Sequence, residues 1–82
     1  SLQATKDGRL LVTAVAEGGP AHLAGITHGD EVLAVDGWPA TGRALGEVIE
    51  RIRGPLGTPV TLQLRRGERM FATVAERVRV TP

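Results

Sequence analysis

The sequence predicts an α+β domain in which five to six short strands form a partly closed β-barrel or sandwich, with one short and one long helix at its ends. Short β-rich runs are separated by glycine-containing turns, one segment has a clear helical period, and a later segment alternates apolar and polar residues. A chain of 82 residues without internal repeats has room for one hydrophobic core. We therefore expect a single domain over residues 1–82.

The first part of the chain predicts a hairpin followed by a short helix. Asp7-Gly8 lies between two strand-like runs, Leu2–Thr5 and Arg9–Val15, which is typical of a β-hairpin. After a Gly-Gly loop, Pro20–Ala24 has a proline suited to the first helical turn. Gly25 just beyond this segment is a typical C-terminal cap, so the helix is expected to be short.

The middle of the chain predicts a strand, a turn and the long helix. Glu31–Val35 is apolar and β-rich, and Asp36-Gly37 is expected to end it before the short extended segment Trp38–Ala40. In Ala44–Arg53 the apolar residues recur at positions i, i+3, i+4 and i+7, so they share one helical face. These residues are Leu45, Val48, Ile49 and Ile52.

Two further strands are predicted at the end of the chain. Thr58–Arg66 alternates apolar and polar residues, and Arg69–Val80 follows a turn. Within the last strand, Phe71 is at an odd position whereas Val74 and the later valines are at even positions. Because a strand has a period of two, we expect a bulge or bend between Phe71 and Val74.

Composition excludes several classes of function. The chain has no cysteine or tyrosine, one serine (Ser1) and one lysine (Lys6), which leaves few groups for catalysis. His22 and His28 are too few for a metal cage and are interpreted as surface histidines, so no metal or other cofactor is expected. We expect a domain that is not itself an enzyme.

Charge and hydropathy disfavour two classes of partner. The charge of +1 arises from interleaved acidic and basic residues, and aromatic residues make up 2% of the chain. Nucleic-acid binding is therefore not expected. The longest nearly apolar run, Leu10–Ala16, is too short to span a bilayer, so direct membrane insertion is not expected either.

Several motifs occur in an order that resembles the centre of a bacterial PDZ domain. They are Gly19-Pro20-Ala21, Ala24-Gly25-Ile26, Gly29-Asp30 and Val35-Asp36-Gly37, followed by the long helix and an alternating strand. The resemblance covers nearly the whole chain and implies the circularly permuted bacterial arrangement of the fold. Asp30 is interpreted as a structural residue that bonds local backbone amides at the start of a strand.

The stretch Ile52-Arg53-Gly54-Pro55-Leu56-Gly57-Thr58-Pro59-Val60-Thr61-Leu62 is similar to one in the PDZ domains of bacterial carboxyl-terminal processing proteases. That resemblance implies a parent serine protease of the bacterial cell envelope or periplasm, with its catalytic residues in a neighbouring domain of the same chain. It also implies a carboxylate-binding loop immediately before the first strand. The chain begins at Ser1, so we expect that loop to be truncated.

In PDZ domains an extended peptide adds a strand to an exposed sheet edge. The resemblance therefore implies that the C-terminal tail of a protein substrate binds between the first strand and the long helix, with an aliphatic or small apolar terminal residue. Leu45 is expected to lie nearest the pocket for that residue. The candidate peptide-binding residues are Leu2, Gln3, Ala4, Leu45, Val48, Ile49 and Ile52.

An alternative is a structural module for interdomain docking, with no free peptide binding. Trp38, the single tryptophan, is a candidate anchor for a neighbouring domain, although it can equally pack over its own domain. An open groove would favour peptide binding, whereas an exposed Trp38 would favour docking.

Overall fold

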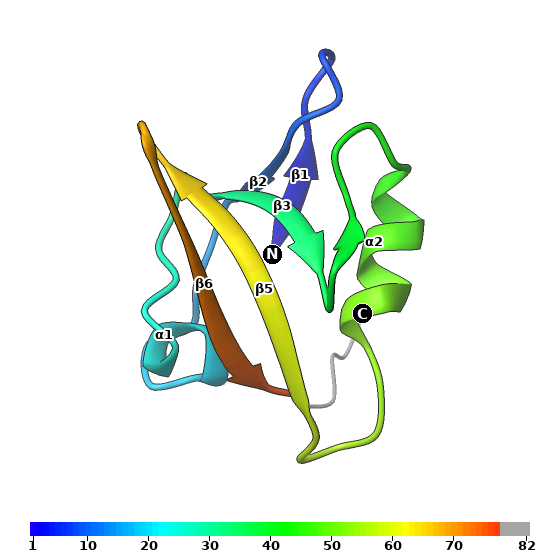
Figure 1. The fold of residues 1–82 in the computed structure, drawn as a ribbon. Coiled ribbons are helices and arrows are strands. Elements are labelled where there is room, and N and C mark those ends of the chain that lie inside the picture. Colours follow the sequence, from blue (N-terminus) through cyan, green and yellow to red (C-terminus); the bar gives the residue numbers. More distant parts are fainter. Residues whose placement is uncertain (78–82) are drawn as a thin grey trace.

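The computed structural model describes residues 1–77, which form one antiparallel sheet and two α-helices (Figure 1). The strand order is β1-β2-β3-β5-β6, with β4 paired to β3, and within these residues the two end strands do not pair to close a barrel. This confirms the predicted fold class. The elements are β1 (Leu2–Ala4), β2 (Leu10–Val12), α1 (Pro20–Leu23), β3 (Glu31–Val35), β4 (Trp38–Pro39), α2 (Leu45–Ile52), β5 (Pro59–Arg66) and β6 (Arg69–Glu76).

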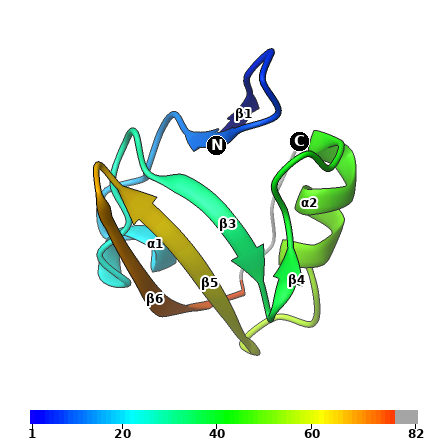
Figure 2. The ribbon, with the colours of Figure 1, turned by 45° about the horizontal axis from the view of Figure 1, so that its top comes forward.

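The first hairpin has a loop one residue longer than its Asp-Gly turn predicts. Thr5 N–H donates to the carbonyl oxygen of Arg9 at 2.8 Å, and Gly8 N–H donates to that of Thr5 at 3.1 Å. The loop is therefore Lys6–Gly8, a turn followed by a residue in the left-handed region, where Gly8 has φ +83°. Figure 2 shows this hairpin beside the start of α2.

The short helix α1 ends as predicted. Gly25 N–H donates to the carbonyl oxygen of His22, and Ile26 N–H donates to that of Ala21, both at 3.0 Å. This pair of bonds is the Schellman motif, and Gly25 has the positive φ that the motif requires. The motif turns the chain so that the Ile26 side chain enters the core, where 3% of it is exposed.

Strand β3 lies between β5 on one edge and β2 and β4 on the other. It joins β4 through Asp36 and Gly37, which have φ 48° and 80°, the backbone of a two-residue type I′ turn. The register between β3 and β5 shifts between Val32 and Ala34, which places a bulge at Leu33. The bulge lets apolar residues before and after it face the same core.

Strand β6 corrects one prediction. Its pairing with β5 is regular from Arg69 to Glu76, so the expected bulge between Phe71 and Val74 is wrong. Val74 pairs with Thr61 on the outer face of the sheet and is 57% exposed. Val74 is thus an apolar residue on the solvent face of an edge strand, which explains why the sequence pattern suggested a change of phase. The rest of the predicted strand, Val78–Val80, lies outside the described residues.

The helix α2 matches its prediction, since Ala44 and Arg53 are its N-cap and C-cap residues. It contacts β1 and β3, whereas α1 contacts β6 at the other end of the sheet (Figure 1). Val48 on α2 is fully buried and packs with apolar residues of the sheet. The helix thus covers the core and stands beside the edge strand β1.

Candidate functional site

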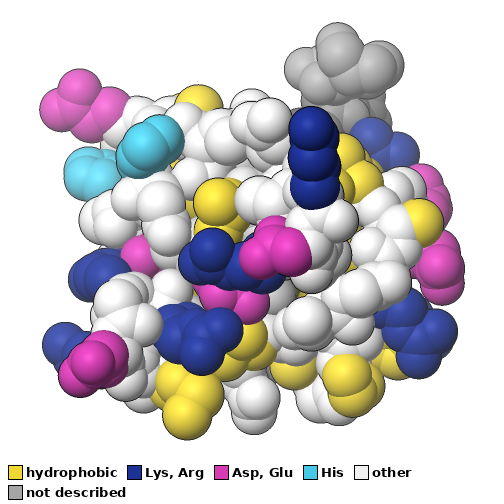
Figure 3. Space-filling view, turned by 90° about the horizontal axis from the view of Figure 1, so that it is seen from above, with side chains coloured by type: hydrophobic (Ala, Val, Ile, Leu, Met, Phe, Trp, Pro, Cys, Tyr) yellow, Lys and Arg dark blue, Asp and Glu magenta, His cyan; other side chains and the backbone are white. Residues whose placement is uncertain are grey.

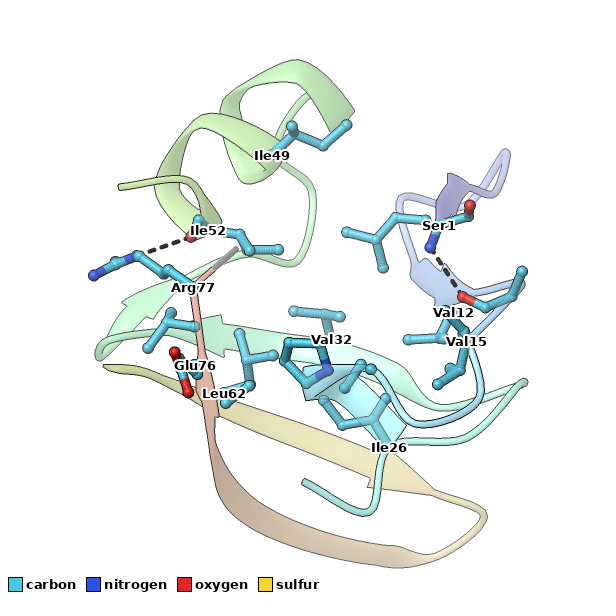
Figure 4. Close-up of a pocket in the computed structure, with 18 of the residues that line it drawn as sticks. Ser1, Val12, Val15, Ile26, Val32, Ile49, Ile52, Leu62, Glu76 and Arg77 are labelled. Carbon is cyan, nitrogen blue, oxygen red and sulfur yellow. Dashed lines mark hydrogen bonds between the residues drawn. The ribbon is translucent and has the colours of Figure 1, made fainter. Parts of the chain in front are cut away.

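An apolar cavity of about 350 Å³ lies between β1, α2 and the inner face of the sheet. In Figure 4, Ile49 and Ile52 point into it from α2, Val12 and Val15 point from the opposite wall, and Val32 lies at its base. Its charged lining residues are Arg53, Glu76 and Arg77. The cavity has the size and apolar lining of a ligand pocket.

The hydrogen-bond pattern of β1 shows which backbone groups are free to bind a further strand. Ser1 and Thr5 bond to the two residues that flank β2, through Thr13 N–H to Ser1 O at 3.0 Å and through Thr5 N–H to Arg9 O at 2.8 Å. Gln3, which is opposite Leu11, has the same parity, so its backbone also faces β2. The N–H and C=O groups of Leu2 and Ala4 therefore face the open edge beside α2.

Three of the candidate residues line the cavity: Leu2 from β1, and Ile49 and Ile52 from α2. All three are half-buried. Because β1 runs antiparallel to α2, its first residues stand beside the last turns of the helix. The cavity therefore lies at the Ser1 end of the groove.

The other candidates lie around the cavity. Ala4 is exposed on the same face of β1 as Leu2, and Gln3 is exposed on the opposite face. Leu45, in the first turn of α2, is half-buried against the core and does not line the cavity. Val48 is 0% exposed and cannot touch a ligand unless the core rearranges. We therefore place Val48 in the core rather than in the groove.

Arg77 is a residue of this region that the sequence did not single out. Each of its side-chain N–H groups has a partner: the backbone oxygens of Ile52, Arg51 and Pro59 and the side chains of Thr58 and Asp36. Two of these bonds satisfy carbonyl groups at the C-terminal end of α2. A Cβ on Gly54 would lie 2.7 Å from Arg77 Nε, so glycine at this position leaves room for the contact. Arg77 thus fixes the end of the helical wall.

Asp30 lies at another part of the fold and acts in structure, as its motif predicts. Its two carboxylate oxygens each accept a bond from Arg66 at 2.8 Å, and Thr27 N–H donates to it at 2.9 Å. The bonded Arg66 guanidinium lowers the pKa of Asp30 below its ordinary value of 3.8, against the opposing effect of burial. The distant partner Arg66 was not predicted, because 36 residues separate the two.

His22 and His28 both lie at the surface, as interpreted from the sequence. His22 Nδ1 accepts a hydrogen bond from Gly18 N–H at 2.9 Å, and His28 is exposed. Residues 1–77 contain no cluster of three or more acidic, histidine or cysteine side chains that could hold a metal. Acidic and basic side chains are interspersed on the face shown in Figure 3.

Trp38 is half-buried and packs against the core cluster. The guanidinium carbons of Arg51 and Arg43 lie 4.7 and 5.1 Å from the centre of its ring. It is therefore packed over its own domain, with two cations beside the ring.

Comparison with known proteins identifies the fold family. Residues 11–66 match the family model described as PDZ domain. The chain belongs to the PDZ family. Two curated relatives are a carboxy-terminal-processing protease of Bartonella bacilliformis, 35% identical over 66 residues, and a probable CtpA-like serine protease of Staphylococcus aureus, 40% identical over 62 residues. The matches cover 79% and 76% of this chain but only 15% and 12% of those relatives.

Solved structures show the same similarity. One is the PDZ domain of a carboxy-terminal protease from Vibrio cholerae in complex with a peptide, with a TM-score of 0.81 and 26% identity over 98% of this chain and 92% of that one. Another is the photosystem II D1 C-terminal processing protease, with a TM-score of 0.85 and 26% identity over 99% of this chain and 22% of that one. The chain thus corresponds to the PDZ part of such proteases and is not itself catalytic. No helix among the described residues has the length and apolarity to cross a membrane.

Proposed function

We propose that this PDZ domain binds the C-terminal tails of protein substrates by adding the tail as a strand to β1. The observation that carries the proposal is the open edge of β1, where the backbone groups of Leu2 and Ala4 are free and an apolar cavity lies beside Leu2. Main-chain hydrogen bonds at such an edge give affinity, and pockets for alternate side chains give selectivity.

An antiparallel tail would place its terminal residue opposite Leu2, beside the cavity. Directly paired residues have side chains on the same face, so the terminal side chain enters the cavity with Leu2, Ile49 and Ile52. The third residue from the end pairs with Ala4 and passes Leu45, and the penultimate side chain shares the face of Gln3. Leu2 N–H is then the free-edge donor nearest the terminal carboxylate. We expect an affinity of about micromolar or weaker, because the interface is small.

In the longer protein, we propose that the domain presents bound tails to a separate serine protease domain and regulates it. Support comes from the protease relatives, of which this chain matches 12–15%. A location in the bacterial cell envelope is part of the same proposal and rests on the resemblance to carboxyl-terminal processing proteases.

The alternative of a purely structural docking module has less support. Its expected anchor, Trp38, is half-buried and packs against its own core. The open cavity beside β1 favours peptide binding instead.

A titration followed by backbone-amide NMR tests the proposal. The probes are one peptide with a free apolar C-terminus and the same peptide with an amidated terminus. We expect shifts at Leu2–Ala4 and along α2 with the free acid, and much weaker binding of the amide, because the amide removes the terminal charge. Shifts confined to other surfaces, or equal binding of both peptides, would contradict tail recognition.

A further inference from the structure

The open edge of β1 is short, since the strand has only three residues. Of the residues in the strand, only Leu2 and Ala4 direct backbone groups to the free side. The next residue of the same parity is Lys6, which lies in the hairpin loop Lys6–Gly8 rather than in the strand. A tail paired through Leu2 and Ala4 therefore has its last three residues in the ladder, and a fourth has no strand beside it.

The loop Lys6–Gly8 is held in place by its own hydrogen bonds. Thr5 Oγ1 accepts a bond from Arg9 N–H at 3.0 Å and also bonds the carboxylate of Asp7. Together with the backbone bonds between Thr5, Gly8 and Arg9, these contacts give the loop one defined position. The loop is therefore poorly suited to extend β1 when a longer peptide arrives.

At the same end of the groove, a hydrogen bond connects the hairpin loop after β1 to the segment before α2. Gly42 N–H, in the segment that leads into α2, donates to the carbonyl oxygen of Gly8 at 3.0 Å. A Cβ on Gly8 would lie 3.4 Å from Gly42 Cα, at ordinary van der Waals distance, so the hydrogen bond is the contact that joins the two residues. We call this contact the Gly8–Gly42 bridge. The bridge joins the hairpin loop after β1 to the segment before α2. It lies beyond Ala4, at the end of the groove away from the cavity.

We propose that the groove recognises only the last three residues of a tail, and that the chain upstream leaves the groove at the Gly8–Gly42 bridge. This inference rests on the proposed function. It makes Gly8 and Gly42 determinants of how much of a substrate is recognised. Tails that share their last three residues then bind alike whatever precedes them, which suits a domain that must accept many substrates.

N-acetylated peptides of three, five and eight residues with the same last three residues test this inference. We expect the dissociation constants of the three peptides to agree within about twofold. The Gly42 amide should exchange at the same rate in every complex as in the free domain, because the bridge stays closed. An affinity gain of about tenfold or more from three to eight residues would overturn the inference while supporting peptide binding. Absence of binding by all three peptides would overturn both.

Two substitutions with similar backbone strain separate the bridge from a general effect on stability. Gly8→Ala strains the backbone of the bridge itself, whereas Gly67→Ala places similar strain in the turn between β5 and β6. Both positions have positive φ. We expect Gly8→Ala alone to speed Gly42 exchange and to make the eight-residue peptide bind more tightly than the three-residue one. Identical length dependence in the two variants would overturn the role of the bridge.

Discussion

The start of the central strand β3 and the edge strand β1 treat polar groups in opposite ways. Around the start of β3, the buried carboxylates of Asp30 and Glu31 are paired with arginines, and no buried side-chain polar atom among the described residues lacks a partner. At β1, by contrast, the backbone N–H and C=O groups of Leu2 and Ala4 face an open edge, with an apolar cavity at one end of it. In the first region the buried polar side chains all have partners, which stabilises the fold. In the second region the backbone groups have no partner in the sheet and are available to a ligand.

The largest expected effect on stability comes from removing the Asp30–Arg66 ion pair. Asp30→Ala removes both bonds to Arg66 and the bond from Thr27 N–H. We expect a loss of about 2–3 kcal/mol in the free energy of unfolding, below the range for fully buried pairs because water reaches Arg66. Urea unfolding followed by Trp38 fluorescence measures it, with Glu17→Ala, at an exposed position, as the control. A loss under about 0.5 kcal/mol would show that Asp30 is not structural.

Proline substitutions in β1 distinguish the edge that pairs with β2 from the open edge. Gln3→Pro removes an N–H that bonds β2, so we expect a loss of stability of about 1–3 kcal/mol. Ala4→Pro removes an N–H of the open edge, so stability should change by less than about 0.5 kcal/mol while peptide affinity falls about tenfold. Chemical denaturation and a peptide titration of both variants check this. Equal losses of stability would contradict the assigned edges.

A smaller effect is expected at the end of α2. Gly54→Ala forces the methyl group against Arg77, whose bond to Ile52 O is 2.9 Å long. We expect a loss of about 1–2 kcal/mol, because helix-end carbonyl groups lose their donor. Gly46→Ala, inside α2 with nothing within 4 Å, should instead gain up to about 0.5–1 kcal/mol. Thermal unfolding of the two variants compares them, and a loss in both would mean that Arg77 is not the cause.

The smallest expected effect is the pH dependence of the stability that the Asp30–Arg66 pair contributes. Because Arg66 lowers the pKa of Asp30, this pair contributes stability above pH 3.8, and the contribution is lost as the pH falls through the lower folded-state pKa. Wild-type protein should therefore lose more stability between pH 6 and pH 3 than Asp30→Asn does. Urea midpoints at both pH values measure the difference. Equal losses in the two proteins would show that the pair is not coupled to folding.

Local patterns predicted most of the fold. Asp36-Gly37, the cap at Gly25 and the helical period of Ala44–Arg53 each depend on neighbouring residues, and each was predicted correctly. Contacts between distant segments were not predictable in this way. The Asp30–Arg66 pair and the outward position of Val74 depend on how strands meet across the sheet.

The candidate site was also only partly predictable from the sequence. The apolar face of α2 was evident, but the sequence could not tell which residues on it face the core and which face the groove. Val48 and Ile49 are neighbours in sequence, and only Ile49 lines the cavity. Leu45 was expected nearest the terminal residue, yet the cavity lies at the other end of the helix, because the antiparallel packing of β1 and α2 sets which end is near Ser1.

The most direct test of strand addition is amide hydrogen exchange in β1, with and without a saturating C-terminal peptide. We expect the Ala4 and Leu2 amides to become protected by about tenfold or more, whereas the Gln3 amide, already bonded to β2, changes little. Unchanged exchange at Leu2 and Ala4 in the saturated complex would contradict it.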